Sequence, residues 1–333
     1  MKPRLALLTG LAAGAVLTLA ANPAAAANFR VAYLASSSQN GYNQAIFAGI
    51  QKAAKDLGDV DVEMFDGAFD SAKQYSQVED VVAGGKFDAM IVTPNDTVGI
   101  ATALEEATKA GMKVAATLFP IGPNLDTLEP QVPGLTTTVA NLTSVDATAQ
   151  ANAVVDYCAQ KNPCKVVLML GQLIYPFDNL RNDVYRKILG EHPNIQIVAS
   201  GEGNYDPQQS LTVMQNILQA HSDLDAVLSC ADQHIAGVII ALKDAGIDPG
   251  SVYLMGLGLN QIMVDSIRAG EASATLAQHP YITGVEALKA METTLKGGTA
   301  PTSIDVLKLV DAPLVVDRAW LDAHPDFKAE WQG

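Results

Sequence analysis

Polar and aromatic side chains follow the first short apolar run of the chain, in a spacing that suits a ligand-binding wall. Residues 31–35 are apolar, and Ser36, Asn40, Tyr42 and Asn43 follow them before apolar residues resume at helical spacing. Hydroxyl and amide groups bond to the hydroxyls of a small polar molecule, and an aromatic face packs on the C–H face of a sugar ring. We therefore interpret this stretch as one wall of a small-molecule site.

Side chains of the same kinds follow several later apolar runs. In open parallel sheets, ligands bind outside the carboxyl ends of the strands, so these residues are expected to meet there. Each also has a structural alternative: Ser36 suits a loop or an N-cap, Asp232 suits a helix cap, and the two phenylalanines suit the core. The further ligand-binding candidates are Thr93, Phe119, Phe177, Arg181, Asp232, Asn260 and Gln278.

No motif in the sequence indicates catalysis, a cofactor or a metal. There is no Gly-x-Ser-x-Gly elbow, no His-Glu-x-x-His and no P-loop, and nothing pairs a nucleophile with a base. Cys158 and Cys164 lie six positions apart with no further Cys or His nearby, which favours a disulfide in an exported protein. Cys230 ends an apolar run and is interpreted as a buried small side chain, with a place in a pocket wall as the alternative.

The elements that must position these residues alternate between strand and helix. Apolar periodicity predicts helices between the runs, for example Ile46, Ile50, Ala53 and Leu57 on one face, with Gly58 at the end. Such alternation produces parallel sheets covered by helices, and two series predict an α/β protein with two doubly wound lobes. The predicted strands are 30–35, 60–65, 88–92 and 114–118, then 165–170, 196–199, 226–229, 252–255 and 274–276.

The first residues have the features of an export signal and not of a folded element. Lys2 and Arg4 precede an uncharged apolar run that is short for a membrane span, and Ala25–Ala27 suits a cleavage site. We expect cleavage near Ala27 and export of the mature protein. The formal net charge of −15 argues against nucleic-acid binding, which requires a basic surface.

Several stretches, taken in order, resemble periplasmic solute-binding proteins of the ribose-binding type, the substrate-capturing parts of ABC importers. They include VAYLASSSQNGYNQAIFAGIQKAAKDLG, FDAMIVTPND and ATLAQHPYITGVEAL. The resemblance implies two lobes joined by a three-crossing hinge and a ligand between the lobes. It also implies a periplasmic location, a membrane ABC permease as partner, and a monomer. We expect a leader at 1–27, an N-terminal lobe at 28–141 plus about 281–307, and a C-terminal lobe at about 142–280 plus 308–333.

Some residues of this chain match ligand-binding positions of the family, and others differ from the residues that the family carries there. The family's cluster after the first strand is matched by Ser36, Asn40, Tyr42 and Asn43. Thr93 matches a polar position after the third strand. Arg181 matches an arginine that reaches sugar hydroxyls, and Gln278 matches a glutamine near a crossing. Leu118 and Phe119 stand where sugar-binding members carry an acid–arginine pair. Ala231 replaces an asparagine, and Gly258 replaces an aspartate.

Losing these polar partners would exclude a ribose-like pose unless Asp232, Asn260 or Gln261 compensates, because each unpaired buried polar group costs about 1–3 kcal/mol. The expected function is capture of a sugar, a polyol or a related small polar molecule for an ABC permease. The alternatives are a non-sugar or partly apolar ligand, and a sensor that reports ligand to a chemoreceptor or histidine kinase. A lac-repressor-type regulator would need an N-terminal helix-turn-helix, where this chain has its leader.

Overall fold

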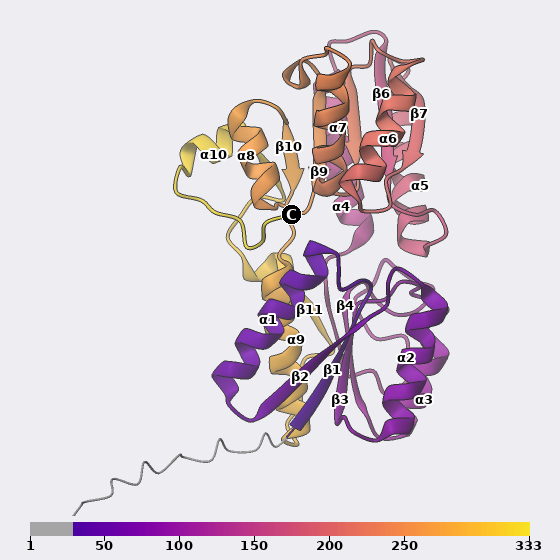
Figure 1. Cartoon of the computed structure of the whole chain (residues 1–333), viewed down its shortest axis with the longest axis vertical. Helices are drawn as coiled ribbons and strands as arrows, with labels where there is room; N and C mark the ends of the chain where they lie inside the picture. Colours follow the sequence, from indigo (N-terminus) through magenta and orange to yellow (C-terminus); the bar gives the residue numbers. More distant parts are fainter. Residues whose placement is uncertain (1–28) are drawn as a thin grey trace, which may run out of the picture.

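The computed structural model describes residues 29–333, and the predicted leader at 1–27 lies outside these described residues. The described chain forms two six-stranded sheets, each covered by helices, and the sheets lie in two lobes stacked along the long axis of the molecule (Figure 1). The prediction of two doubly wound α/β lobes is confirmed. No helix of residues 29–333 is both long and apolar enough to span a membrane.

The first sheet has the strand order β11-β5-β4-β3-β1-β2, and its strands pair in parallel. Its central strands are buried along most of their length, which is why they read as continuous apolar runs and not as alternating patterns. The elements of this lobe are β1 (Phe29–Ala35), α1 (Gly41–Leu57), β2 (Val60–Asp66), α2 (Ser71–Gly84), β3 (Ala89–Val92), α3 (Ala101–Lys109), β4 (Lys113–Leu118), β5 (Thr137–Ala140), α9 (Pro280–Leu295) and β11 (Ser303–Asp305).

The second sheet has the order β12-β10-β9-β8-β6-β7, and only the short edge strand β12 pairs antiparallel. Apolar clusters lie on both of its faces, so this sheet is also buried between helices. Its elements are α4 (Thr143–Cys158), β6 (Cys164–Leu170), α5 (Pro176–Gly190), β7 (Ile195–Glu202), α6 (Pro207–Leu218), β8 (Ala226–Ser229), α7 (Asp232–Asp244), β9 (Tyr253–Leu257), α8 (Gln261–Ala269), β10 (Ala274–Leu276), β12 (Val315–Asp317) and α10 (Arg318–Ala323).

The chain passes between the lobes three times: between β5 and α4, between β10 and α9, and between β11 and β12. After the second passage, α9 packs beside α1 in the first lobe, where Leu288 and Met291 share a core with Ile46 and Ile50 (Figure 1). On this pairing we propose the lobe boundaries expected from the sequence, 28–141 plus about 281–307 and about 142–280 plus 308–333.

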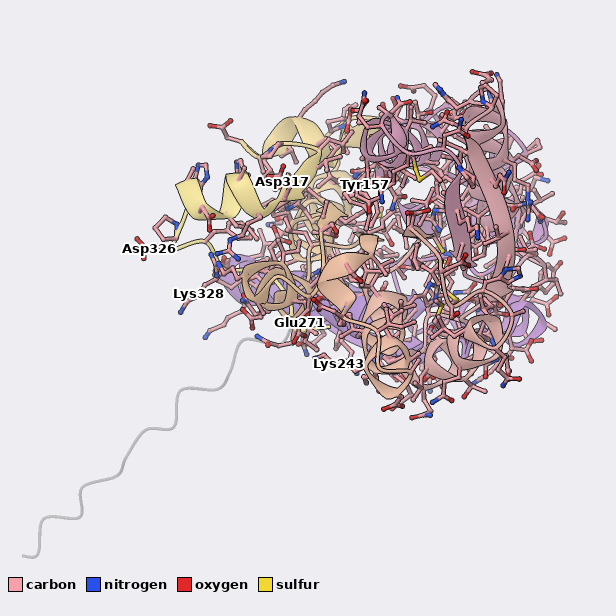
Figure 2. The ribbon with its side chains drawn as sticks, turned by 90° about the horizontal axis from the view of Figure 1, so that it is seen from above. Tyr157, Lys243, Glu271, Asp317, Asp326 and Lys328 are labelled. Atoms are coloured by element: carbon pink, nitrogen blue, oxygen red, sulfur yellow. A yellow bond between two sulfur atoms is a disulfide. The ribbon has the colours of Figure 1, made fainter. Side chains whose placement is uncertain are left out.

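The C-terminal segment, residues 324–333, has no regular structure and returns to the region between the lobes. Asp326 and Lys328 of this segment lie at the periphery in the view from above (Figure 2), whereas Trp331 is buried. The carbonyls of Trp331 and Gln332 accept hydrogen bonds from Gln261 N and Ile262 N, the free N–H groups that open α8. This end of the chain is therefore a fixed part of the fold.

Candidate ligand-binding site

A cavity of about 60 Å³ lies between the two lobes, at the carboxyl ends of strands from both sheets. Its lining residues follow or end β1 to β4 in the first lobe and β6 to β9 in the second. Side chains of the two lobes touch across it, so the lobes are in a closed arrangement.

The segment after β1 forms a polar wall whose side chains are fixed by internal hydrogen bonds. Asn40 caps α1, because its Oδ1 accepts from Tyr42 N at 3.0 Å and from Asn43 N at 3.3 Å. The Asn43 Oδ1 accepts from Ser36 N, and the Ser36 hydroxyl donates to the carbonyl of Thr93 at 3.0 Å. The stretch thus serves both as a helix start and as a cavity wall.

Thr93 lies behind this wall and not in the cavity lining. Its hydroxyl is 2.9 Å from the Tyr33 hydroxyl and 2.7 Å from the Thr117 hydroxyl, and all three residues are fully buried. Burial raises the pKa of Tyr33, so its phenol stays protonated and available as a donor. The chain of hydroxyls joins β1, β3 and β4 beneath the cavity floor.

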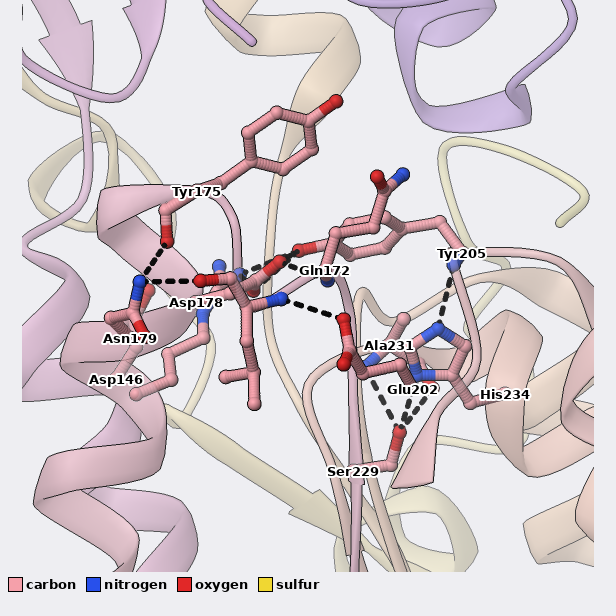
Figure 3. Close-up of polar contacts among 12 residues, drawn as sticks. Asp146, Gln172, Tyr175, Asp178, Asn179, Glu202, Tyr205, Ser229, Ala231 and His234 are labelled. Carbon is pink, nitrogen blue, oxygen red and sulfur yellow. Dashed lines mark hydrogen bonds and ion pairs between the residues drawn. The ribbon is translucent and has the colours of Figure 1, made fainter. Parts of the chain in front are cut away.

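A buried ion pair stands at the centre of the second lobe's wall. Asp178 Oδ1 lies 3.0 Å from Arg181 Nη1, and the Tyr205 hydroxyl donates to the same carboxylate (Figure 3). Burial raises the pKa of Asp178, while Arg181 and the hydrogen bond from Tyr205 oppose that shift. A side chain at Gly171 would place its Cβ 2.2 Å from Asp178 Oδ2, so only glycine leaves room for this contact.

Tyr205 is itself held by His234 at the start of α7. The backbone N–H of Tyr205 donates to His234 Nε2 at 2.8 Å, and Nδ1 of the same ring lies 3.0 Å from the Ser229 hydroxyl (Figure 3). Burial lowers the pKa of His234 to about 3, and the positive charge of Arg181 acts in the same direction. The imidazole is therefore neutral and positions Tyr205.

The other side of the cavity is apolar and joins the lobes. The rings of Phe119 from the first lobe and Phe177 from the second stack with centroids 3.9 Å apart. The guanidinium of Arg181 lies 5.3 Å from the centroid of Phe119, within cation–π range. Phe69 stacks on Tyr205 in a second pair between the lobes. These contacts make one aromatic seam across the cleft.

Asp232 and Asn260 do not line the cavity, and their contacts explain why. The Asp232 carboxylate accepts from Asn260 N at 3.0 Å and from the Thr275 hydroxyl at 2.7 Å, and burial raises its pKa to about 7. Asn260 caps α8 through a bond from Met263 N. Neither residue, nor Gln261, is directed to compensate for the polar groups missing from the cavity.

Gly258 is required by packing. It has φ of +140°, a conformation open essentially to glycine alone, and its carbonyl accepts from the Trp331 indole N–H at 2.9 Å. A Cβ at this position would lie 2.9 Å from the Trp331 ring and 3.1 Å from Asp232 Oδ2. The C-terminal segment and Asp232 thus fill the space that the expected aspartate would use.

Gln278 links the crossing region to the cavity wall without lining the cavity. Its Oε1 accepts from the Tyr42 hydroxyl at 2.8 Å, and its Nε2 donates to Asp146 Oδ2 at 2.6 Å. Burial raises the pKa of Asp146 to about 7, although Arg181 and hydrogen bonds oppose the shift. The side chains connect α1 of one lobe to α4 of the other through the second crossing.

The structure brings seven of the eleven sequence-selected residues to the cavity: Ser36, Asn40, Tyr42, Asn43, Phe119, Phe177 and Arg181. Thr93, Asp232, Asn260 and Gln278 lie behind its walls. Nine further lining residues were not in the selected set: Phe69, Asn95, Leu118, Tyr175, Tyr205, Cys230, Ala231, Gln233 and Leu257. Phe69 and Tyr205 follow the second strand of each lobe, so extending the strand-end rule to those strands would have found them.

The arrangement can bind a ligand but shows no reaction centre. Asp178, Arg181 and Tyr205 bind one another, and no group of three or more His, Cys, Asp or Glu side chains among residues 29–333 could hold a metal ion. Cys158 and Cys164 form a disulfide between the end of α4 and the start of β6, and Cys230 is a free cysteine at the cavity wall.

Comparison with known proteins agrees with this geometry. Residues 31–299 match the model of the periplasmic binding protein domain, so the chain belongs to the periplasmic binding protein family. The expectations of a periplasmic binding fold and of a solute-binding protein without enzymatic activity are thereby confirmed.

Individual relatives extend over most of the chain. The ribose import binding protein of Bacillus subtilis is 29% identical over 289 residues, 87% of each chain. The galactofuranose-binding protein of Escherichia coli is 25% identical over 306 residues, 90% of this chain and 92% of the relative. The fold is also similar to that of a Caulobacter myo-inositol binding protein, with a TM-score of 0.76, 22% identity and coverage of 89% and 96%.

Proposed function

We propose that this protein captures a sugar or polyol between its lobes and delivers it to an ABC permease of the membrane. The observation that carries the proposal is the cavity itself, in which hydroxyl, amide and guanidinium groups face aromatic rings at the carboxyl ends of two parallel sheets. That combination recognises ring hydroxyls and C–H faces together. Membership in the periplasmic binding protein family and the ribose and galactofuranose relatives support the same ligand class.

Binding would use opening and closing of the lobes. Aromatic contacts between the lobes cover the cavity, so a ligand enters when the contacts between Phe119 and Phe177 and between Phe69 and Tyr205 separate. A ligand that touches both lobes then favours a closed state, in proportion to the contacts it gains there. The closed state is the form that we propose docks on the permease, with the binding protein acting as a monomer.

The proposal includes the periplasm as the site of action. The family is one of periplasmic binding proteins. We propose that the leader at residues 1–27 directs export and is removed near Ala27, after which the disulfide between Cys158 and Cys164 is compatible with an oxidising compartment.

Thermal unfolding of the mature protein, refolded free of bound ligand, tests the function. The panel contains pentoses, hexoses, inositols and linear polyols, with amino acids, organic acids and amines as non-sugar comparisons. A ligand at 100 times its Kd adds about 2.7 kcal/mol of stability and raises the midpoint clearly. Stabilisation by sugars or polyols is the expected result, and stabilisation only by non-sugars would contradict the proposal.

A further inference from the structure

Two residues of the cavity wall each carry a buried polar atom that is unpaired among the described residues. Asn95 Oδ1 and Arg181 Nε are buried, with no hydrogen-bond partner among the described residues, and both side chains line the cavity. Asn95 is 1% exposed and Arg181 is 3% exposed. Buried polar atoms are normally paired, so these two mark where a ligand hydroxyl would accept from Arg181 and donate to Asn95.

The polar and apolar groups come from different parts of the first sheet. In the strand order β4-β3-β1, the polar segment after β1 and the apolar end of β4 are separated by β3, and Asn95 lies in the loop that follows β3. Leu118 and Phe119 end or follow β4, and they belong to one apolar cluster with Tyr175 and Phe177 of the second lobe. The cavity therefore has a polar side and an apolar side.

Three bulky residues of the cavity wall adopt a backbone conformation that is unfavourable for them. Leu118 has φ of +69°, Phe69 has φ of +53° and Tyr205 has φ of +57°, and all three line the cavity. Bulky L-residues rarely adopt this left-handed conformation, which glycine and asparagine tolerate better. Strained positions of this kind cluster at ligand sites, where the surrounding structure fixes them. Leu118 in particular places an apolar side chain where an asparagine would fit the backbone better and supply hydrogen bonds.

We propose that the ligand is a sugar or polyol with one apolar edge, a deoxy position, a methyl group or an O-methyl group, that faces Leu118, Phe119 and Tyr175. Its hydroxyls lie toward Asn95 and Arg181. The inference rests on the proposed function and narrows it. A ligand that is hydroxylated on every edge would bury hydroxyls against Leu118 and Phe119 without partners, and it would therefore bind more weakly.

Calorimetric titration with matched pairs tests this inference. The pairs are D-galactose with D-fucose, L-mannose with L-rhamnose, D-glucose with 3-O-methyl-D-glucose, and myo-inositol with its mono-O-methyl ethers. In at least one pair we expect the deoxy or O-methyl member to bind tenfold or more tightly than its parent. If parents bind as tightly as or more tightly than their partners in every pair that binds, the inference is wrong although the proposed function stands. If no member of any pair binds, the inference is wrong, and the thermal unfolding panel, which also contains pentoses and linear polyols, decides whether the proposed function is wrong as well.

Leu118→Asn sharpens the test because asparagine suits the left-handed backbone and presents an amide to the cavity. We expect the preference for the apolar-edged ligand to fall at least tenfold. Phe119→Tyr, which adds one hydroxyl to the same side, should move the preference in the same direction if Leu118→Asn folds poorly. The matched control is Ile174→Asn, because Ile174 is 80% exposed and does not line the cavity. An unchanged preference in both cavity variants, or an equal loss in the control, would overturn the assignment of the apolar side.

Discussion

The side of the cavity that follows β1 and the side formed by β4 and α5 differ in chemistry and in how their side chains are held. On the β1 side, Ser36, Asn40 and Asn43 are fixed by hydrogen bonds within the strand-to-helix connection and by one bond from the Ser36 hydroxyl to the carbonyl of Thr93 in the same lobe. On the β4 side, Phe119 is fixed by stacking on Phe177 of the other lobe, and Leu118 is held in a left-handed conformation. The first side is held within one lobe, whereas the stacking that fixes Phe119 on the second side requires both lobes.

This difference explains how much the sequence could predict. The two lobes follow from alternating apolar runs and helical periodicity, and the β1 side follows from a helix cap placed directly after a buried strand. The short strands β11 and β12 were missed because they are edge strands that are largely half-buried and do not read as apolar runs, unlike β10, which is equally short but fully buried. Residues 136–143, TTTVANLT, read in the sequence as an extended stretch and a candidate hinge, and they contain β5, an inner strand of the first sheet.

The β4 side was harder to predict because its determinants are not local. No sequence feature near Leu118 indicates that this residue has a positive φ. Phe177, on which Phe119 stacks, lies 58 positions away in the sequence. Asp232 and Gly258 illustrate the same limit on the second lobe. Their roles depend on Thr275 and on Trp331 near the chain's end, which no spacing in the sequence connects with them.

Arg181 stands where the two sides meet, and its removal has the largest expected effect. Arg181→Met leaves the Asp178 carboxylate buried without its cation, which costs about 3–5 kcal/mol of unfolding free energy. It also removes a donor from the cavity, so ligand affinity should fall more than tenfold. Urea unfolding and calorimetric titration measure the two effects. Arg186→Ala, an exposed change in the same helix, should alter stability by less than about 1 kcal/mol. Comparable losses in the two variants would contradict the role of Arg181.

Gly258→Ala tests whether the missing aspartate reflects packing. The new Cβ meets Trp331 and Asp232 in a conformation that alanine rarely adopts, so we expect a loss of roughly 2–3 kcal/mol. Gly270→Ala is the matched control, because Gly270 also has a positive φ but no atom lies within 4 Å of its Cβ position. It should cost about 1 kcal/mol. Equal losses in urea unfolding would show that Trp331 and Asp232 do not restrict this position.

Asp146 provides a pH test of the link between the lobes. Its pKa is raised from an ordinary value of 3.8 to about 7, so the folded protein holds this proton more strongly than the unfolded chain does. Stability from this group is fully present below about pH 4 and is lost as the pH rises toward 7. The Asp146→Asn variant lacks that pH dependence. The free energy of unfolding of the variant minus that of the parent should therefore rise by roughly 1–3 kcal/mol between pH 4.5 and pH 8.

Denaturant unfolding across this pH range measures the Asp146 effect. Asp156→Asn serves as the control, since Asp156 is exposed on the same helix. Its curve should run parallel to that of the parent protein. A parallel curve for Asp146→Asn as well would mean that this carboxyl is not a buried proton-binding group.

Thr93→Val should have the smallest effect. It tests whether the Thr93 hydroxyl supports the polar side of the cavity from behind or contacts the ligand directly. The change removes a hydroxyl bonded to Tyr33 and Thr117, which costs about 1–2 kcal/mol of stability. Thr93→Ser keeps the hydroxyl and should retain most of that stability. Because Thr93 lies behind the wall, ligand affinity should change less than threefold in either variant. A tenfold loss of affinity in Thr93→Val alone would place the hydroxyl in contact with ligand.

A crystal structure of the protein with its tightest-binding sugar or polyol tests the central claim most directly. We expect the ligand between the lobes, with hydroxyls within hydrogen-bond distance of Asn95 Oδ1 and Arg181 Nε and an apolar edge against Leu118 and Phe119. A ligand bound outside this cavity, or one whose hydroxyls face Leu118 and Phe119 while Asn95 and Arg181 stay unpaired, would contradict it.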